Sequence, residues 1–204
     1  ISSLGDFESV REVSKTIKDK AVAALARAII KDIDAAGEAL KPARNPVIHT
    51  FVSSSDIHLK YQFNKTREQA LEMAAEAVKR SRKYTDIVEF SAMDATRSDW
   101  DFLCRLYEAA ISNGATIINV PDTVGYALPD EYARLIEYLK TNVKGIEDVV
   151  ISVHCHDDLG LAVANSILAI EKGAGQVECA VNGIGERAGN ASLEEVAMII
   201  DTRK

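Results

Sequence analysis

Long apolar runs, paired cysteines and basic clusters are all scarce in this chain of 204 residues. No apolar stretch approaches the roughly 20 residues that a membrane-spanning helix needs, and no charged start followed by an apolar run indicates a signal peptide. The three cysteines, Cys104, Cys155 and Cys179, are odd in number and widely spaced, which favours reduced thiols over disulfides. We therefore expect a cytoplasmic protein that contacts no membrane.

The charge of the chain also restricts its partners. Lys and Arg total 24 against 31 Asp and Glu, which gives a net charge of −7, and the two signs are interspersed. A nucleic-acid surface needs clustered basic residues, so we expect no nucleic-acid partner and a small-molecule one instead. Because 47% of the residues are hydrophobic, the chain can bury one substantial core. We predict that residues 1–204 form one domain or part of one.

Strand-like apolar runs recur along the chain, and an amphipathic stretch follows each. The runs lie at 21–26, 47–52, 86–90, 116–120, 149–153 and 177–181. Between them, Thr66 with Gln69 and Ser192 with Glu195 fit the capping box of a helix start, and Pro129 suits a first helical position. This alternation predicts a parallel α/β sheet. Six strands fit an open doubly wound sheet by count, whereas a closed (β/α)8 barrel needs eight.

Two histidines stand where one of the apolar runs ends. His154 and His156 are two residues apart, so in a strand their side chains point to the same face. The run before them is typical of a strand buried on both faces, and in parallel α/β proteins the chemistry gathers at the carboxyl ends of the strands. Asp157 and Asp158 follow as candidate carboxylates that orient the histidines. The pattern favours a divalent metal site over histidines that only hydrogen-bond at a strand end.

Further polar residues follow the ends of neighbouring runs. Gly183 and Gly185 precede a helix start, where backbone N–H groups could cradle an anion. The spacing to Gly189 departs from the dinucleotide-binding fingerprint, so a nicotinamide enzyme is set aside. Thr123 could donate to a substrate carboxylate or keto oxygen, while Asp122 could order a neighbouring histidine. A plain turn is the alternative interpretation of each of these segments.

His49, Glu89 and Asp94 complete the set of candidate site residues. His49 lies inside a strand-like run, where it either lines a pocket or stays a hydrogen-bonded core residue. Glu89 and Asp94 stand at another strand end, where an acidic residue is a candidate base. His58 follows three serines, and we expect it in a solvated loop. These candidates recur at one end of successive strands, as in barrel enzymes that assemble a site from loops at one face.

Four of these segments together resemble the 2-isopropylmalate and homocitrate synthase family. The stretch around the paired histidines fits the family signature His-x-His-(Asp or Asn)-Asp-x-Gly, and the glycine loop and two shorter segments are also similar to it. The segments are Ile151-Ser-Val-His154-Cys-His156-Asp-Asp-Leu-Gly160, Asn182-Gly-Ile-Gly-Glu-Arg-Ala-Gly-Asn190, Asn119-Val-Pro-Asp-Thr-Val-Gly-Tyr126, and His49-Thr-Phe with Ser55-Asp-Ile-His58. The resemblance runs over nearly the whole chain.

The resemblance implies an incomplete (β/α)8 TIM barrel with about six of its eight βα units, which condenses acetyl-CoA with 2-oxoisovalerate in leucine biosynthesis. It implies a divalent metal, Mn²⁺, Zn²⁺ or Mg²⁺, held by His154 and His156 with Asn190 in or beside the coordination sphere. It also implies that Thr123 and His49 contact the 2-oxo acid and that acetyl-CoA is the co-substrate. The glycine loop would bind substrate through Gly183 and Gly185, and the full-length protein would be a homodimer.

The chain also departs from the family pattern. The family's metal-binding aspartate and catalytic arginine lie in an Arg-Asp-Gly-Glu-Gln motif, and no Arg-Asp-Gly run occurs in this sequence. We therefore expect a fragment, inactive alone, that lacks the first strands and the carboxyl-terminal regulatory domain. Met93 stands where relatives have Glu, so Glu89 or Asp94 would have to be the catalytic carboxylate. The alternatives are citramalate or homocitrate synthase, a metal-dependent carbon–carbon lyase, or a non-catalytic fragment.

Overall fold

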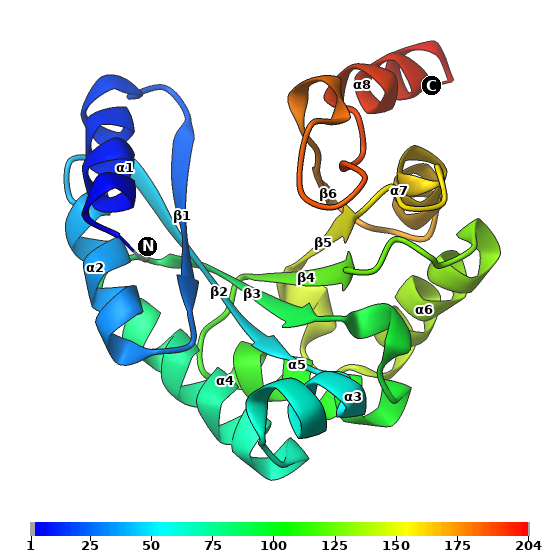
Figure 1. Ribbon diagram of the computed structural model, residues 1–204, viewed down its shortest axis with the longest axis horizontal. Helices are drawn as coiled ribbons and strands as arrows, with labels where there is room; N and C mark the ends of the chain where they lie inside the picture. Colours follow the sequence, from blue (N-terminus) through cyan, green and yellow to red (C-terminus); the bar gives the residue numbers. More distant parts are fainter. Residues whose placement is uncertain (1–2, 204) are drawn as a thin grey trace.

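Six parallel strands form one curved sheet in the computed structural model, which describes residues 3–203 (Figure 1). The strands lie side by side in chain order, and each pairs in parallel with the next. They are β1 (Ala21–Arg27), β2 (Asn45–Ser53), β3 (Ile87–Met93), β4 (Ile117–Asp122), β5 (Val150–Cys155) and β6 (Gln176–Glu178).

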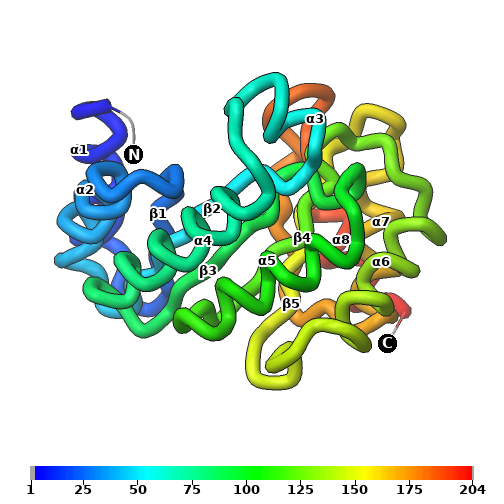
Figure 2. Tube along the Cα trace, turned by 90° about the horizontal axis from the view of Figure 1, so that it is seen from below, coloured from blue at the N-terminus to red at the C-terminus, as the bar shows by residue number. Residues whose placement is uncertain are grey.

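Helices connect the strands and cover the convex side of the sheet, as the view in Figure 2 shows for α4 and α5. The longer ones are α1 (Leu4–Thr16), α2 (Ile30–Leu40), α4 (Arg67–Ser81), α5 (Trp100–Ser112), α6 (Pro129–Asn142), α7 (Ala162–Glu171) and α8 (Leu193–Thr202). Short helical turns are α3 (Asp56–His58), η1 (Leu59–Phe63), η2 (Ala95–Arg97), η3 (Ile146–Asp148) and η4 (Val181–Gly183). No helix within residues 3–203 is long and apolar enough to span a bilayer.

The strand order decides between the two architectures that the sequence left open. A doubly wound sheet reverses its strand order at a switch point. Here β1 to β6 follow without reversal, and the helices lie outside the curve, as in part of a barrel wall (Figure 1). The expected incomplete (β/α)8 barrel with six of eight units is therefore confirmed. A strand forms at each of the six predicted places, although the sixth covers only Gln176–Glu178 and not the predicted run up to 181. The three cysteines are free, as expected.

Local sequence explains where several helices begin. Thr66 N donates to Gln69 Oε1 over 3.0 Å and Gln69 N donates to Thr66 Oγ1 over 3.2 Å, so this predicted capping box forms before α4. Pro129 occupies the first turn of α6, as predicted. At the start of α8, Ser192 Oγ accepts a hydrogen bond from Glu195 N. The carboxylate that contacts Ser192 is that of Glu194, which accepts from Ser192 Oγ, and not that of Glu195. The second predicted capping box is therefore only half correct.

The main core lies between the sheet and its helices. Phe90, Ile118 and Val153 of the central strands are fully buried there. At the β1 edge the side chains alternate: Ala24 is buried against α2, whereas Leu25 is 54% exposed on the concave side. Side chains at every second strand position therefore point into the concave side, where polar residues gather.

Candidate active site at the carboxyl ends of the strands

A cavity of about 520 Å³ opens on the concave side of the sheet. All six strands or the loops after them contribute to its wall. The lining residues include Leu25, His49, Phe51, Ser91, Met93, Asn119, Pro121, Thr123, His154, His156, Glu178, Gly185, Glu186 and Asn190. Six of the nine residues singled out from the sequence as site residues thus line one cavity, while Glu89, Asp94 and Gly183 lie outside its wall.

His154 and His156 lie together in this cavity, with ring centroids 4.9 Å apart and rings nearly perpendicular at 73°. The Nδ1 of His156 lies 2.7 Å from the carbonyl oxygen of Thr123, which fixes the proton on Nδ1 and leaves Nε2 as a free electron-pair donor. The Nδ1 of His154 lies 2.8 Å from Glu178 Oε2. The two atoms are close, but their geometry is not that of a hydrogen bond, so the contact is an electrostatic one. Anchoring of one ring nitrogen while the other faces a cavity is the arrangement of metal-binding histidines.

Asn190 reaches the histidines because the glycine loop folds back on β5. Its Nδ2 lies 3.3 Å from His154 Nε2, and its backbone bridges to His156. Gly183 lies behind it, with φ of +66°, and the Gly183 carbonyl accepts from Asn190 N over 2.9 Å. A Cβ at Gly185 would displace the Asn190 side-chain amide from its present position, so the glycine leaves room for that amide. The loop therefore presents the Asn190 side chain to the two imidazoles.

The carboxylates expected to orient the histidines lie elsewhere. Asp158 pairs with Arg187, whose guanidinium Nη2 is 2.8 Å from Asp158 Oδ1 and keeps the pKa of Asp158 below its usual value. Asp157 Oδ1 accepts from the backbone at the start of α7. Asp122 accepts from Thr96 Oγ1 over 2.9 Å, so the Thr123 carbonyl, and not the Asp122 side chain, orders His156. These expected roles are wrong, because each carboxylate finds a nearer donor.

The carboxylate that does contact a histidine of the pair is that of Glu178, which is not among the residues singled out from the sequence. It stands inside the run 177–181, whose apolar pattern predicts a strand and no site residue. Strand pairing sets it beside His154 in the β5–β6 register. A single glutamate within an otherwise apolar run was the signal that could have identified it, because an unpaired charge is rarely buried in a core strand.

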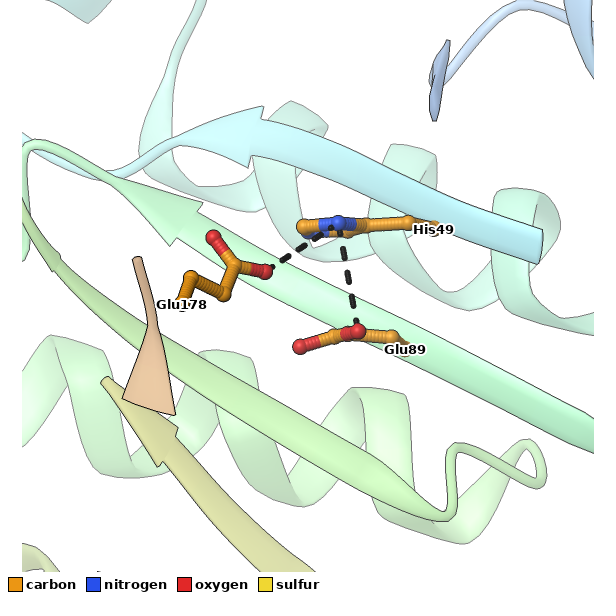
Figure 3. Close-up of side chains that lie close together, drawn as sticks. All are labelled: His49, Glu89 and Glu178. Carbon is orange, nitrogen blue, oxygen red and sulfur yellow. Dashed lines mark ion pairs between the residues drawn. The ribbon is translucent and has the colours of Figure 1, made fainter. Parts of the chain in front are cut away.

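Beneath the cavity lies a group of residues that we call the floor: His49 and Glu178, which line the cavity, and Glu89 and Gln176, which lie behind them. The Nδ1 of His49 lies 3.4 Å from Glu178 Oε1 and 3.9 Å from Glu89 Oε2 (Figure 3). Gln176 Nε2 donates to Glu89 Oε1 and to Ser152 Oγ, each over 2.9 Å. The floor thus holds two carboxylates and an imidazole but no lysine or arginine.

Burial and repulsion set the charges of the floor. Burial, with the nearby negative charge of Glu178, raises the pKa of Glu89 to about 7. Burial alone would raise the pKa of Glu178 too, but contacts with His154 and His49 bring it below its usual value. Burial lowers the pKa of His49 despite the charge of Glu178. A negative Glu178 therefore faces a neutral His49 and a Glu89 that exchanges its proton near neutral pH.

Two neighbouring sets of donors, which meet where Glu178 contacts His154, could hold a cation. One comprises His154 and His156 with Asn190. The other comprises His49, Glu89 and Glu178, whose ligand atoms lie within 4.8 Å of one another. Imidazole nitrogens with oxygen donors suit Mn²⁺, Zn²⁺ or Mg²⁺. The residues present therefore fit a divalent ion.

Beside Thr123 of the cavity wall lies a group of residues that does not line the cavity and that we call the rim: Ser55, His58, Asp94 and Arg97. Asp94 is fully buried and faces Arg97, not the cavity. His58 is half-buried, with Nδ1 3.0 Å from Ser53 Oγ and Nε2 3.2 Å from Arg97 Nη2. The expectation of a solvated His58 is therefore wrong.

Comparison with known proteins agrees with this arrangement. The HMGL-like family model matches residues 1–204. The chain is 60% identical over its whole length to a 2-isopropylmalate synthase of Pyrococcus furiosus and 59% identical to one of Syntrophus aciditrophicus, and it covers 41% and 40% of those proteins. It thus spans about two fifths of the length of these curated relatives.

Solved structures share the fold. Hydroxymethylglutaryl-CoA lyase from Pseudomonas aeruginosa superposes with a TM-score of 0.78 at 21% identity, over 95% of this chain and 67% of that one. An HMG-CoA lyase from Bacillus subtilis gives 0.75 at 22% identity, over 95% and 67%. The barrel wall, the cavity at its carboxyl end and the match along every residue lead to one conclusion: the chain belongs to the HMGL-like family.

Proposed function

We propose that the protein condenses acetyl-CoA with 2-oxoisovalerate to give 2-isopropylmalate in a metal-dependent Claisen-type reaction. The observation that carries this proposal is the pair of histidines in one cavity: His156 is held through Nδ1 and leaves Nε2 as a donor, and His154 lies beside it with Nε2 next to the Asn190 amide. Thr123 and His49 line the same cavity. Relatives near 60% identity that bear the name 2-isopropylmalate synthase support the same reaction.

In this proposal His154 and His156 hold the divalent ion, Mn²⁺, Zn²⁺ or Mg²⁺, and Asn190 stands beside it. When bound, the ion supplies a Lewis acid that polarises the ketone and favours the negative charge that develops on its oxygen. The Thr123 hydroxyl donates a hydrogen bond to the 2-oxo acid. His49, whose Nε2 lies 2.6 Å from Ser91 Oγ, forms a neutral wall for the substrate.

Glu89 is the carboxyl group best suited to proton exchange. Its pKa of about 7 matches an acid–base group that works near neutral pH. It is only 4% exposed and lies beneath His49, so it exchanges protons through the floor and does not touch the substrate directly. Asp94 is engaged by Arg97 and lacks access to the cavity, which does not support a role as base.

The remaining roles are extensions of the same proposal. Gly185 lines the cavity and Gly183 supports Asn190, so the glycine loop binds substrate and lies near acetyl-CoA. We further infer that residues 1–204 form part of a single barrel domain, that the full-length protein is a homodimer, and that it works in the cytoplasm with only small-molecule substrates.

The test is thiol release from acetyl-CoA by the full-length protein that contains residues 1–204, measured with Mn²⁺ and each of three 2-oxo acids. We expect release with 2-oxoisovalerate and its loss on chelation. Preference for pyruvate would indicate citramalate synthase, and preference for 2-oxoglutarate would indicate homocitrate synthase. Cleavage of a hydroxyacyl-CoA without condensation would indicate a lyase. No thiol release with any 2-oxo acid would reject the proposal and favour a non-catalytic fragment.

A further inference from the structure

Asp94 and Arg97 form a buried ion pair directly after β3. Arg97 Nη2 lies 2.7 Å from Asp94 Oδ2 and Arg97 Nε lies 2.8 Å from Asp94 Oδ1, so the guanidinium grips both oxygens. Ser55 Oγ also donates to Asp94 Oδ2, and His58 Nδ1 lies 3.5 Å from the same oxygen. These contacts hold the carboxylate in one place.

The backbone of Asp94 is held just as firmly. Its φ of +69° and ψ of 38° lie in the left-handed region, which Asp and Asn adopt more readily than most residues. Ser98 Oγ donates to the Asp94 carbonyl over 2.8 Å. In this conformation the Asp94 N–H donates to Thr123 Oγ1 over 2.9 Å. The direction of that N–H therefore depends on the side-chain contacts of Asp94.

This bond decides what the Thr123 hydroxyl can do. A hydroxyl accepts through its lone pairs and donates one proton. Because Thr123 Oγ1 accepts from Asp94, its own proton stays available, and no acceptor for it is found among residues 3–203. The Thr123 carbonyl accepts from His156 Nδ1 over 2.7 Å. Thr123 thus connects Asp94 to a histidine of the cavity.

We propose that Asp94, fixed by Arg97, is a positioning residue that aims the Thr123 hydroxyl at the carboxylate or keto oxygen of the 2-oxo acid. The inference rests on the proposed function, since it takes Thr123 as a contact of that substrate. It gives Asp94 a role different from the catalytic carboxylate predicted from the sequence.

The first experiment compares Asp94→Ala with Asp94→Asn in the protein. Loss of a hydrogen bond to a charged substrate corresponds to about tenfold in affinity. We expect D94A to raise the KM for 2-oxoisovalerate about tenfold while kcat stays within about threefold. Asn keeps an acceptor for Arg97 and tolerates the left-handed backbone, so D94N should stay within about threefold of wild type in both constants. Equal KM values for D94A and wild type would overturn the inference.

The second experiment is a double-mutant cycle with Thr123→Val, read by thiol release and by calorimetric binding of 2-oxoisovalerate with Mn²⁺. T123V should weaken 2-oxoisovalerate about tenfold, and D94A should add nothing in that background, because Asp94 acts through the missing hydroxyl. Additive effects would overturn the inference and leave the proposed function standing. An unchanged KM and binding constant in T123V would also overturn the inference, by showing that the Thr123 hydroxyl does not contact the 2-oxo acid, while the thiol release itself would leave the proposed function standing.

Two further variants keep the test decisive. Should D94A fail to fold, Asp94→Gly replaces it in both experiments with the same expected result, because glycine adopts the positive φ without strain. Asp34→Ala is the matched control: Asp34 pairs with Arg80 over 2.7 Å on the outer helices α2 and α4. Its KM should equal that of wild type, and a tenfold rise there would overturn the inference by showing that loss of any such pair disturbs the cavity.

Discussion

The floor and the rim each contain a buried acidic residue, and the groups around these two carboxylates have opposite charges. Glu89 at the floor is buried beside a second carboxylate, and burial together with the negative charge of Glu178 raises the pKa of Glu89 to about 7. Asp94 at the rim, five positions further along, meets the guanidinium of Arg97. The partners that a buried carboxylate meets, and not its place at a strand end, decide which role it can have.

Removal of Arg97 should give the largest change in stability. Arg97→Ala leaves the fully buried Asp94 without its cation, and breaking one partner of a buried pair costs about 3–5 kcal/mol. Because the Arg97 side chain is 28% exposed, we expect the lower end of that range. Urea unfolding measures it. A loss below about 1 kcal/mol would show that the rim does not depend on the pair.

Replacement of Glu89 should stabilise the metal-free protein at alkaline pH. The folded-state pKa of Glu89 is raised from 4.5 to about 7, so the folded protein binds more protons than the unfolded one in that range. Its contribution to stability is therefore present at low pH and lost as pH rises through about 7. Glu89→Gln resembles the protonated form and should gain up to about 3 kcal/mol at pH 8.

Unfolding curves from pH 5 to 8, in chelator, check this prediction. The exposed Glu76→Gln of α4 serves as the control, and its curve should keep the wild-type slope. If E89Q keeps that slope as well, the floor does not retain a proton as described.

Replacement of Glu178 should weaken metal binding by the paired histidines and change the pKa of Glu89 in the floor. Glu178→Gln keeps the shape but removes the charge beside His154 Nδ1, and loss of such a support costs about 10–100-fold in metal affinity. It should also lower the pKa of Glu89, since the repelling charge is gone. Titration with Mn²⁺, followed by its electron paramagnetic resonance signal, measures the affinity. Unchanged affinity would contradict the link between Glu178 and His154.

An ion pair whose carboxylate is partly exposed should give the smallest effect. Arg80→Ala removes the partner of Asp34 on the outer helices, where both side chains are about one third exposed. Exposed pairs contribute little because water and salt screen them. Its melting temperature should fall less than that of R97A under the same conditions. An equal fall would mean that burial does not distinguish the rim pair from an outer one.

The fold could be predicted because the spacing of apolar residues differs between strands and helices and is visible in the sequence. His154 and His156 could be placed on one face because i and i+2 positions of a strand always share one. Glu178 could not be paired with His154 from the sequence, since the register between β5 and β6 links residues 24 positions apart. Nor could the role of Asp94 be foreseen, because strand periodicity does not predict its left-handed backbone or the return of Arg97 toward it.

The central claim is that His154 and His156 hold a metal ion that binds the 2-oxo acid. The most direct test is calorimetric titration of 2-oxoisovalerate into the wild-type protein and into His156→Ala. Each titration is carried out once with Mn²⁺ and once with chelator. Binding should require Mn²⁺ in wild type and disappear in H156A. Binding of equal strength in chelator, or in H156A, would contradict the account.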